Sequence, residues 1–411
     1  MIAVLTTSWP LLLGVMLLMV GNGMQGSLLG IRGAIEGFST FELSLVMSAY
    51  FLGFLGGSRM TPDLIRRVGH VRVFAALASL ISASLVIYPV LPNWFAWTLL
   101  RVCIGFSFSG VYVTAESWLN NQSTNETRGQ TLSFYMIVQM LGIIMSQALL
   151  NVADPSDFTL FVIPSVLVSL AFIPILLTAS TAPVFESAKS MKFKELFIAS
   201  PLGCVGMFVT GGIFSALFGM ASVWGTEAGL SVRDISIFIA SIYVGGLLMQ
   251  YPIGRASDRM DRRIMVTALA LLGFLIAFVV FVFKVPFVGF LAVGFLLGGI
   301  TNPLYSLLIA HTNDFLDTEQ MASASSGMIF INGTGAIFGP LITGWMIGAF
   351  GPNGFFAFIG LLMGALATYA FWRMTRRAAP VDAGAFPTFT PQATAMAVGL
   401  VIEQASEQSD E

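Results

Sequence analysis

The chain has 411 residues and a formal net charge of −2; only 10% of its residues are charged, while 56% are apolar. An average globular protein carries about 25% charged residues, so this composition excludes an ordinary soluble enzyme. With a mean hydropathy of +0.86, the chain has too much apolar surface for one water-facing core, which predicts a membrane protein with several spans. The few charges form no basic face, so we expect no nucleic-acid partner.

Apolar stretches long enough to cross a bilayer recur along the chain. A membrane-spanning helix needs about 20 predominantly apolar residues. Residues 1–8 contain no Lys or Arg, so we expect the first stretch to be retained rather than cleaved as a signal peptide. The sequence predicts six spans, a polar stretch and six more spans: 8–31, 41–58, 72–91, 94–118, 129–150 and 158–180, then 199–226, 234–254, 263–283, 286–311, 322–349 and 354–373.

The positive charges predict the orientation, because Lys and Arg accumulate in cytoplasmic loops. Most of the 19 Lys and Arg residues lie in the loops that follow even-numbered spans and after the last span. The opposite loops hold only Arg32, Arg233 and Lys284. Both termini should therefore face the cytoplasm.

The two sets of six spans form an internal repeat. Arg66-Arg67-Val-Gly-His follows the second span, and Asp258-Arg259-Met-Asp-Arg follows the eighth. We predict an N-terminal six-helix bundle at 1–182, a cytoplasmic linker at 183–198 and a C-terminal six-helix bundle at 199–375. We expect residues 376–411, which are rich in Pro, Ala and Thr and end in acidic residues, to be a cytoplasmic, mostly disordered tail.

The loop after the eighth span carries the most specific motif. Its string Gly-Arg-Ala-Ser-Asp-Arg-Met-Asp-Arg-Arg, residues 254–263, resembles the loop signature Gly-x-x-x-Asp-Arg-x-Gly-Arg-Arg of the major facilitator superfamily. Asp261 stands where the signature has its second Gly, so a tight turn there would be made by a residue that adopts left-handed geometry less easily. The first-half copy is weaker, because Arg66 replaces the aspartate and Asp63 lies about one turn earlier.

The fourth span carries a second resemblance. Arg101-Val-Cys-Ile-Gly105 is similar to the Arg-x-x-x-Gly of the superfamily, and Glu116 with Arg128-Gly129 is similar to its Glu and Arg-Gly pair. The strings Glu-Ser-Trp (116–118) and Thr-Arg-Gly-Gln (127–130) look closest to poorly characterised bacterial members of the YcaD type. The resemblance implies an all-α polytopic membrane protein with twelve transmembrane helices in two pseudo-symmetric six-helix bundles, working as a secondary transporter by alternating access in the bacterial inner membrane. It also implies gating roles for Asp63, Arg67, Gly69, Glu116, Arg128, Gly254, Asp258, Arg259 and Arg263.

Two of these gating candidates have alternatives. Counted from the start of its span, Glu116 lies about 33 Å along the helix, at the cytoplasmic edge. It could form a latch with Arg128 when the cavity opens outward, or an exposed interfacial pair of little energetic value. Asp258 could interact with the N-terminus of the eleventh span, or be a solvated loop charge.

Arg101 is the charge placed deepest in a predicted span. A guanidinium facing lipid would cost at least a few kcal/mol, so Arg101 should point into a cavity. There it could hold an anionic group or modulate a proton step, and the alternative is that it braces neighbouring helices through backbone carbonyls.

Further polar side chains at mid-span depth are candidates for a central substrate cavity. Each amide could instead make an interhelical hydrogen bond, as membrane bundles commonly do. With Arg101, the candidates are Asn22, Gln25, Tyr112, Tyr135, Gln139, Tyr243, Asn302, Tyr305 and Asn332. The expected substrate is a small polar or amphipathic solute, and Arg101 favours one with an anionic group.

Other functions have weaker support. The middle thirds of the spans contain no Asp or Glu, so the sequence does not decide how transport is driven, and the alternatives are uniport, anion symport and an unusual proton path. Met136 and Met140, one turn apart, would suit a copper importer, although Met at this spacing is far more often packing. A non-transporting sensor or assembly factor on the same fold is a third alternative. The sequence has no assembled reaction centre, so we expect no enzyme, no cofactor and no metal site, and a monomer in the lipid bilayer.

Overall fold

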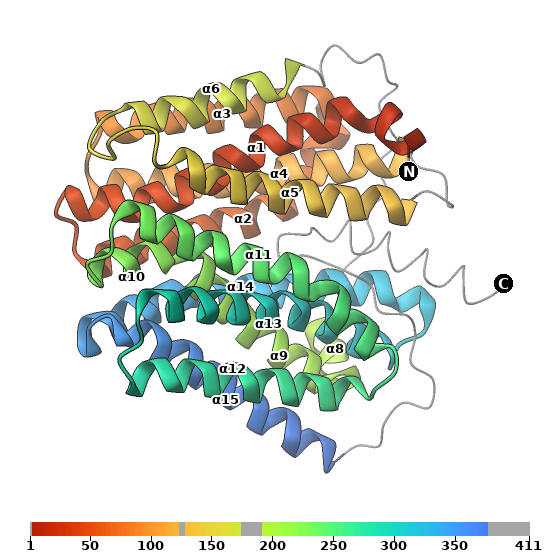
Figure 1. Cartoon of the computed structure of the whole chain (residues 1–411). Helices are drawn as coiled ribbons and strands as arrows, with labels where there is room; N and C mark the ends of the chain where they lie inside the picture. Colours follow the sequence, from red (N-terminus) through yellow and green to blue (C-terminus); the bar gives the residue numbers. More distant parts are fainter. Residues whose placement is uncertain (1, 123–127, 174–190, 377–411) are drawn as a thin grey trace.

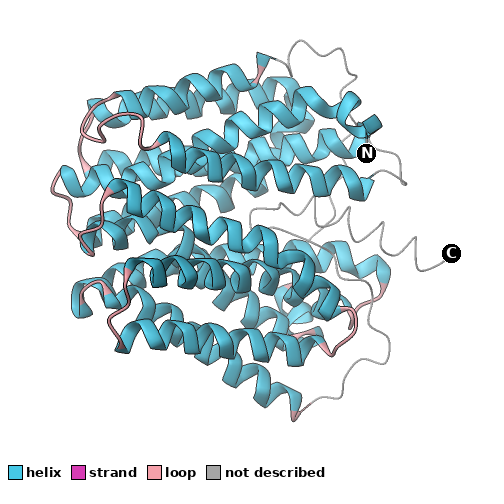
Figure 2. Ribbon diagram, in the orientation of Figure 1, coloured by secondary structure: helices cyan, strands magenta, loops and turns pink. Residues whose placement is uncertain are grey.

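The computed structural model describes residues 2–122, 128–173 and 191–376 of the chain, and within these ranges the regular structure is helical, without strands (Figures 1 and 2). The first half contains α1 (Ile2–Ile35), α2 (Thr40–Val68), α3 (His70–Val90), α4 (Trp94–Gln122), α5 (Arg128–Leu149) and α6 (Thr159–Ala171). The second half contains α8 (Phe193–Ala199), α9 (Pro201–Phe214), the π-turn η1 (Ser215–Gly219), α10 (Ala221–Glu227), α11 (Val232–Ser257), α12 (Arg262–Val282), α13 (Phe287–Asn313), α14 (Thr318–Phe350) and α15 (Asn353–Met374).

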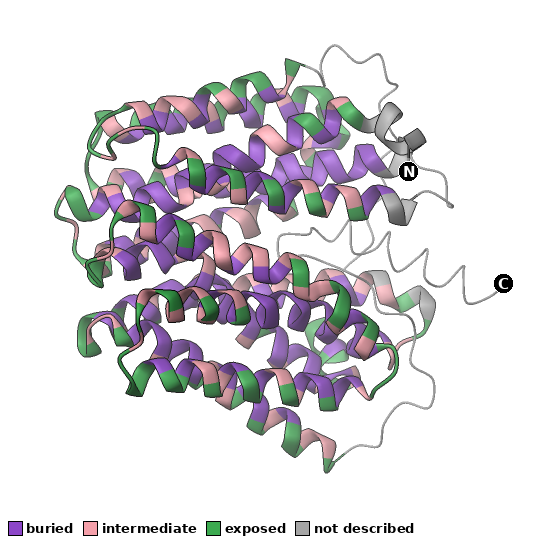
Figure 3. Ribbon diagram, in the orientation of Figure 1, coloured by how far each residue is buried: buried purple, intermediate pink, exposed green. Residues whose placement is uncertain are grey.

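The all-α membrane fold predicted from the sequence is confirmed. Among the described residues, eleven helices are long and apolar enough to cross a membrane, and each corresponds to one predicted span. The remaining predicted span, 158–180, corresponds to the shorter apolar helix α6. Its last residues, 174–180, lie outside the described residues. Large apolar side chains such as Trp345 (64% exposed) and Val288 (75%) lie on the outer faces of their helices, as a lipid environment requires. Figure 3 shows the burial pattern that results, with exposed positions on the outward faces.

Local capping explains several helix starts. Ser39 and Glu42 form a capping box at the start of α2, and the hydroxyl of Ser231 accepts a hydrogen bond from the backbone N–H of Asp234 at the start of α11 (3.1 Å). Asp261 likewise caps α12, because its carboxylate accepts from the backbone N–H of Arg263 (2.9 Å). Its φ of −59° is ordinary, so the expected left-handed strain at this position is absent. The aspartate that replaces the signature glycine begins a helix instead.

The internal repeat is visible in the packing of the helices. In the first half, α1 packs on α5, α2 on α4 and α3 on α6; in the second half, α9 packs on α14, α11 on α13 and α12 on α15. These are the same pairs when the spans of each half are numbered in order. A Cβ on Gly105 would overlap the carbonyl oxygen of Tyr50, and one on Gly298 would overlap that of Ile242. Equivalent helix pairs therefore approach closely at equivalent glycines.

The two halves contact each other through α2 with α14, α5 with α11 and α1 with α10. We call the membrane side at which α1 begins and α15 ends the terminal end, and the opposite side the distal end. In Figure 1, α5 and α11 lie close at the distal end and diverge toward the terminal end. Residues 191–198 of the predicted linker are also described and include all but the last residue of α8, which packs on α9 and α14. The predicted tail, apart from Arg376, lies outside the described residues.

Candidate functional site

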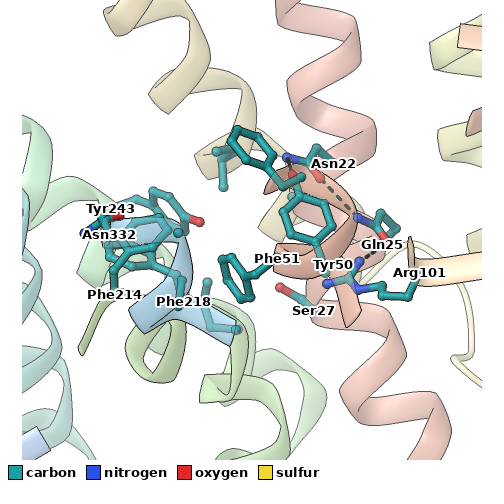
Figure 4. Close-up of a pocket in the computed structure, with 18 of the residues that line it drawn as sticks. Asn22, Gln25, Ser27, Tyr50, Phe51, Arg101, Phe214, Phe218, Tyr243 and Asn332 are labelled. Atoms are coloured by element: carbon teal, nitrogen blue, oxygen red, sulfur yellow. Dashed lines mark hydrogen bonds between the residues drawn. The ribbon is translucent and has the colours of Figure 1, made fainter. Parts of the chain in front are cut away.

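A cavity lies between the two halves, roughly midway along the spans. It encloses about 940 Å³ of space not occupied by protein atoms, the space at its mouth included. Its first-half lining comes from α1, α2, α4 and α5: Asn22, Gly23, Gln25, Gly26, Ser27, Tyr50, Phe51, Phe54, Leu55, Ser58, Arg101, Ile143 and Gln147. Its second-half lining comes from α9, η1, α11 and α14: Phe214, Phe218, Gly219, Ile239, Tyr243, Ile329, Asn332, Gly333 and Ala336. Figure 4 shows the two sets of side chains facing each other.

Arg101 is the charged residue of the lining. Its residue is 5% exposed, Nη1 donates to Oε1 of Gln25, and Nη2 lies 3.7 Å from Sδ of Met47. The guanidinium carbon lies 4.8 Å from the ring centroid of Tyr50. Nε has no hydrogen-bond partner, and among the described side chains no carboxylate lies within ion-pair distance of Arg101. The cavity wall therefore carries a buried, uncompensated positive charge.

A chain of hydrogen bonds holds Gln25 in place for Arg101. Nε2 of Gln25 donates to Oδ1 of Asn22 (3.1 Å), and Nδ2 of Asn22 donates to the hydroxyl of Tyr112 (2.9 Å). The Tyr112 hydroxyl lies 3.4 Å from Sδ of Met19. Because the NH₂ group of Gln25 donates to Asn22 and that of Asn22 donates to Tyr112, the side-chain oxygen of Gln25 is oriented toward the guanidinium of Arg101.

The second-half side of the cavity is aromatic. The rings of Phe214 and Phe218 lie one turn apart, with centroids 4.6 Å from each other, and Phe218 contacts Tyr243 at 4.7 Å. Phe218 belongs to the π-turn η1, which interrupts the seventh span beside the cavity. π-turns within helices frequently occur at functional sites.

The structure brings some of the predicted cavity residues together and separates others. Asn22, Gln25, Arg101, Tyr243 and Asn332 line the cavity. The other predicted residues are buried and absent from its lining. Tyr112 is 1% exposed behind Asn22, Tyr135 donates to Oε1 of Glu116 (3.2 Å), Asn302 bonds the carbonyl of Gly246 (3.5 Å), and Gln139 and Tyr305 are buried at 1% and 0%.

Sequence reasoning missed several lining residues, among them the aromatic residues Tyr50, Phe51, Phe54, Phe214 and Phe218. Tyr50, Phe51, Phe54, Leu55 and Ser58 follow the one-and-three spacing of a single helix face, which is the signal that could have identified them. Gln147, which lies within the predicted fifth span, also lines the cavity, and its Oε1 accepts a hydrogen bond from Ser27 (3.0 Å).

Comparison with known proteins decides the family. The family model described as Major Facilitator Superfamily matches residues 11–241 and 202–400. The chain belongs to the Major Facilitator Superfamily. It is 24% identical to the uncharacterized MFS-type transporter YcaD of Escherichia fergusonii over 86% of this chain and 94% of the relative. It is 26% identical to an uncharacterized MFS-type transporter of Enterobacter sp. (strain 638) over 87% and 96%.

Solved transporters share the fold. The nucleoside transporter NupG matches with a TM-score of 0.72 at 14% identity, over 90% of this chain and 98% of that one. A bacterial homologue of the human lysosomal transporter Spinster, in an inward-facing and unoccupied conformation, matches with a TM-score of 0.68 at 13% identity over 97% of both chains. This member of the Major Facilitator Superfamily is thus an integral membrane protein and a membrane transporter.

The residues of the superfamily loop signature lie at the terminal end. Gly254 is buried near the end of α11, whereas Asp258 and Arg259 are exposed. Nη2 of Arg263 lies 2.6 Å from Oδ2 of Asp261, and hydrogen bonds from Arg263 hold the pKa of this carboxyl below its usual range. Arg262 forms an ion pair with Asp314 in which both side chains are only 3% exposed, so the start of α12 is bound to the end of α13.

The first-half copy of the signature differs. Asp63 pairs with Arg66 on the exposed surface of its own helix, and Arg67 is also exposed. Gly69 has a φ of +84° between α2 and α3, a conformation that favours glycine. Asp63 therefore makes a local ion pair within α2.

Glu116, predicted at the cytoplasmic edge of its span, lies toward the terminal end of α4. It is completely buried, nearly two turns before the end of α4, which continues past the predicted end of the span. Tyr135 on α5 donates to its carboxylate. The side chain of Arg128, its expected latch partner, lies outside the described residues.

Polar contacts join the two halves at and near the distal end. Thr40 donates to Oε1 of Glu227 (2.5 Å), Nδ2 of Asn151 donates to the hydroxyl of Ser236 (3.2 Å), and the Ser48 hydroxyl donates to the carbonyl of Ile337 (2.5 Å). We call these three hydrogen bonds the distal contacts. They link α2 with α10, the α5–α6 loop with α11, and α2 with α14.

The methionine pair does not contribute to the cavity. Neither Met136 nor Met140 is among its lining residues, and Met140 is 8% exposed within the first half. In the part of the chain that the structure describes, no group of three or more His, Cys, Asp or Glu side chains could hold a metal ion. The packing interpretation of these methionines is the simpler one.

Proposed function

We propose that this transporter moves a small amphipathic solute with an anionic group across the bacterial inner membrane, by alternating access of the cavity between two six-helix bundles. The bundles of this proposal are residues 1–182 and 199–375, joined by the linker 183–198, with both termini cytoplasmic. The chain acts as a monomer, and the solute binds between Arg101 on one side and the aromatic residues of the other half.

The uncompensated charge of Arg101 is the observation that carries the proposal. A buried guanidinium without a counter-ion costs several kcal/mol, because its lost hydration is only partly replaced. Its hydrogen bond to Gln25 and its contact with Tyr50 replace part of that hydration, and Nε still has no partner. An anionic group in the cavity would supply the missing charge, and a carboxylate also matches the planar fork of a guanidinium.

The rest of the lining favours an amphipathic solute. The amides of Asn22 and Gln25 lie on the same side as Arg101, whereas Phe214, Phe218 and Tyr243 lie on the opposite side (Figure 4). A solute with a charged end and an apolar or aromatic body would place each end against a matching surface.

The arrangement of the halves supports a role for the distal contacts in alternating access. These contacts hold the halves together at and near one end, while α5 and α11 diverge toward the other (Figure 1). With cytoplasmic termini, this conformer corresponds to an inward-facing state. Exposure of the cavity to the outside would then require the distal contacts to break and the terminal ends to approach.

A ligand screen tests the proposal. Small aliphatic and aromatic carboxylates are compared with their neutral amides by thermal unfolding, because a ligand at 100 times its Kd stabilises the folded state by about 2.7 kcal/mol. We expect carboxylates alone to raise Tm, and Arg101→Ala to abolish this rise while Arg101→Lys retains part of it. Arg233→Ala, which removes an exposed arginine outside the cavity, is the matched control. Uptake into proteoliposomes then measures transport, and equal binding and uptake by wild type and Arg101→Ala would refute the role of Arg101.

A further inference from the structure

Two hollows are lined by consecutive residues near the terminal end of α15, Trp372 and Arg373, and neither shares a lining residue with the cavity. The first is an apolar groove between α12 and α15, with about 1100 Å³ of space not occupied by protein atoms, the open space included. Leu271 and Phe274 of α12 line it together with Gly360, Leu361, Gly364, Ala365, Ala367, Thr368, Tyr369 and Trp372 of α15. The second is a smaller, polar cleft, described below.

The groove exists because small residues of α15 face an aromatic ring of α12. A Cβ on Gly364 would lie 3.1 Å from Cδ2 of Phe274, and one on Gly360 would lie 3.3 Å from Cβ of Ala277. Large side chains border the hollow instead, with Leu361 62% exposed and Trp372 46% exposed. Since both helices are membrane spans, the surroundings of the groove are hydrocarbon, and an alkyl chain is the occupant that matches its lining.

Cationic side chains lie where the groove ends. The guanidinium carbons of Arg373 and Arg376 are each 5.8 Å from the ring centroid of Trp372. Neither arginine has an ion-pair partner among the described side chains. The end of the groove therefore combines an aromatic ring at interface depth with two uncompensated positive charges.

Arg373 also borders the polar cleft. This cleft, with about 260 Å³ of space, is lined by Ser200, Pro201, Leu202, Arg263, His311, Phe315 and Arg373. Ser200 is the N-cap residue of α9, so the positive end of that helix dipole adds to the charge of Arg373. Trp372 in the groove and Arg373 in the cleft are consecutive residues, which makes the two hollows neighbours.

We propose that an anionic phospholipid binds at this site, with one acyl chain in the α12–α15 groove and its phosphate held by Arg373 and Arg376 at the mouth of the cleft. The groove selects an alkyl chain, and the two arginines select a negative headgroup over a zwitterionic one. Guanidinium groups bind phosphate through charge-assisted hydrogen bonds. Each arginine near an anionic membrane surface strengthens binding about five-fold.

Native mass spectrometry of the purified, delipidated full-length protein in neutral detergent tests this site. Phosphatidylglycerol and phosphatidylcholine with identical acyl chains are titrated separately, and glycerol 3-phosphate is added as a competitor without a chain. Arg373→Gln/Arg376→Gln removes the charges, and Ala365→Phe fills the groove at an exposed position. Arg233→Gln is the charge control, and Ala76→Phe, at an exposed position of α3, is the bulk control.

We expect wild type to bind phosphatidylglycerol at least about five-fold more tightly than phosphatidylcholine. The double arginine variant should lose this preference, Ala365→Phe should weaken both lipids, and the two controls should behave as wild type. Equal binding of the two lipids, an unchanged preference in the double variant, or competition by glycerol 3-phosphate at concentrations equal to the lipid would overturn the proposal. A dimer that Ala365→Phe dissociates would also overturn it, because a second copy would then cover the groove.

Discussion

The distal contacts provide a direct way to change the balance between conformers. Ser48→Ala and Asn151→Ala, combined in one variant, remove two of the three hydrogen bonds that join the halves there. A neutral, half-buried hydrogen bond contributes about 1 kcal/mol, so the variant should destabilise the distally closed conformer by about 2 kcal/mol. That difference changes the ratio of the two conformers about 30-fold. We therefore expect more molecules with the cavity open at the distal end.

Cysteine labelling in membrane vesicles measures this change. In a background without Cys103 and Cys204, Ser27→Cys places a thiol on the cavity wall, and a membrane-impermeant maleimide is added from either side. Labelling from the distal side should become faster in the double variant, and labelling from the terminal side slower. Ser241→Ala is the matched control, because this hydroxyl bonds the carbonyl of Phe238 on its own helix (2.6 Å). Unchanged rates from both sides at normal protein levels would show that the distal contacts do not hold the conformer.

Three further predictions concern stability. Gly298→Ala should strongly destabilise the protein because its Cβ would overlap the carbonyl of Ile242, whereas Gly348→Ala, with open space at that position, should leave Tm nearly unchanged. Asp314→Asn should lower the free energy of unfolding by about 3–5 kcal/mol, because it leaves Arg262 buried without its partner carboxylate. Asp63→Asn, which removes one member of an exposed pair, should lower it by under about 1 kcal/mol. Similar losses of Tm in both variants would refute the comparison. Hydrogen bonds from Arg263 lower the pKa of Asp261. The contribution of this carboxylate to stability is therefore present above the ordinary carboxyl pKa of about 4 and is lost as the pH falls through the lowered value. The Tm difference between wild type and Asp261→Asn should accordingly be constant from pH 7 to 5 and shrink near pH 3.

Much of this architecture is determined locally and could be predicted from the sequence. The spans follow from the lengths of apolar stretches, and the bilayer sets that length independently of tertiary contacts. The division into two sets of six follows from the repeat, and the structure shows equivalent helix pairs packing in each half. Arg101 could be assigned to a cavity because a charge at mid-span has few alternatives to facing away from lipid.

The cavity itself was decided by tertiary structure. Helical periodicity predicts which residues share a face, but it does not say whether that face meets the other half or a neighbour in the same half. Gln25 and Tyr112 were equally plausible lining residues, yet Gln25 reaches the cavity while Tyr112 packs behind Asn22. In the same way, Tyr135 contacts Glu116 inside the first half, whereas Tyr243 faces the cavity.

The aromatic residues of the cavity show the same limit of sequence-based prediction, because they line the cavity without having been predicted to do so. Phe51 and Phe218 have no polar group, so residue type does not distinguish them from the other phenylalanines that face lipid or core. The helix face that Phe51 shares with Tyr50 and Phe54 does not show by itself what that face meets. Their position in the cavity depends on how α2 and η1 approach across the interface, where a Cβ on Gly219 would lie 3.5 Å from the ring of Phe51. Residue type and periodicity determined where the helices form and that Arg101 on α4 faces away from lipid. The packing of two halves against each other, which depends on residues far apart in the chain, decided which side chains meet that charge.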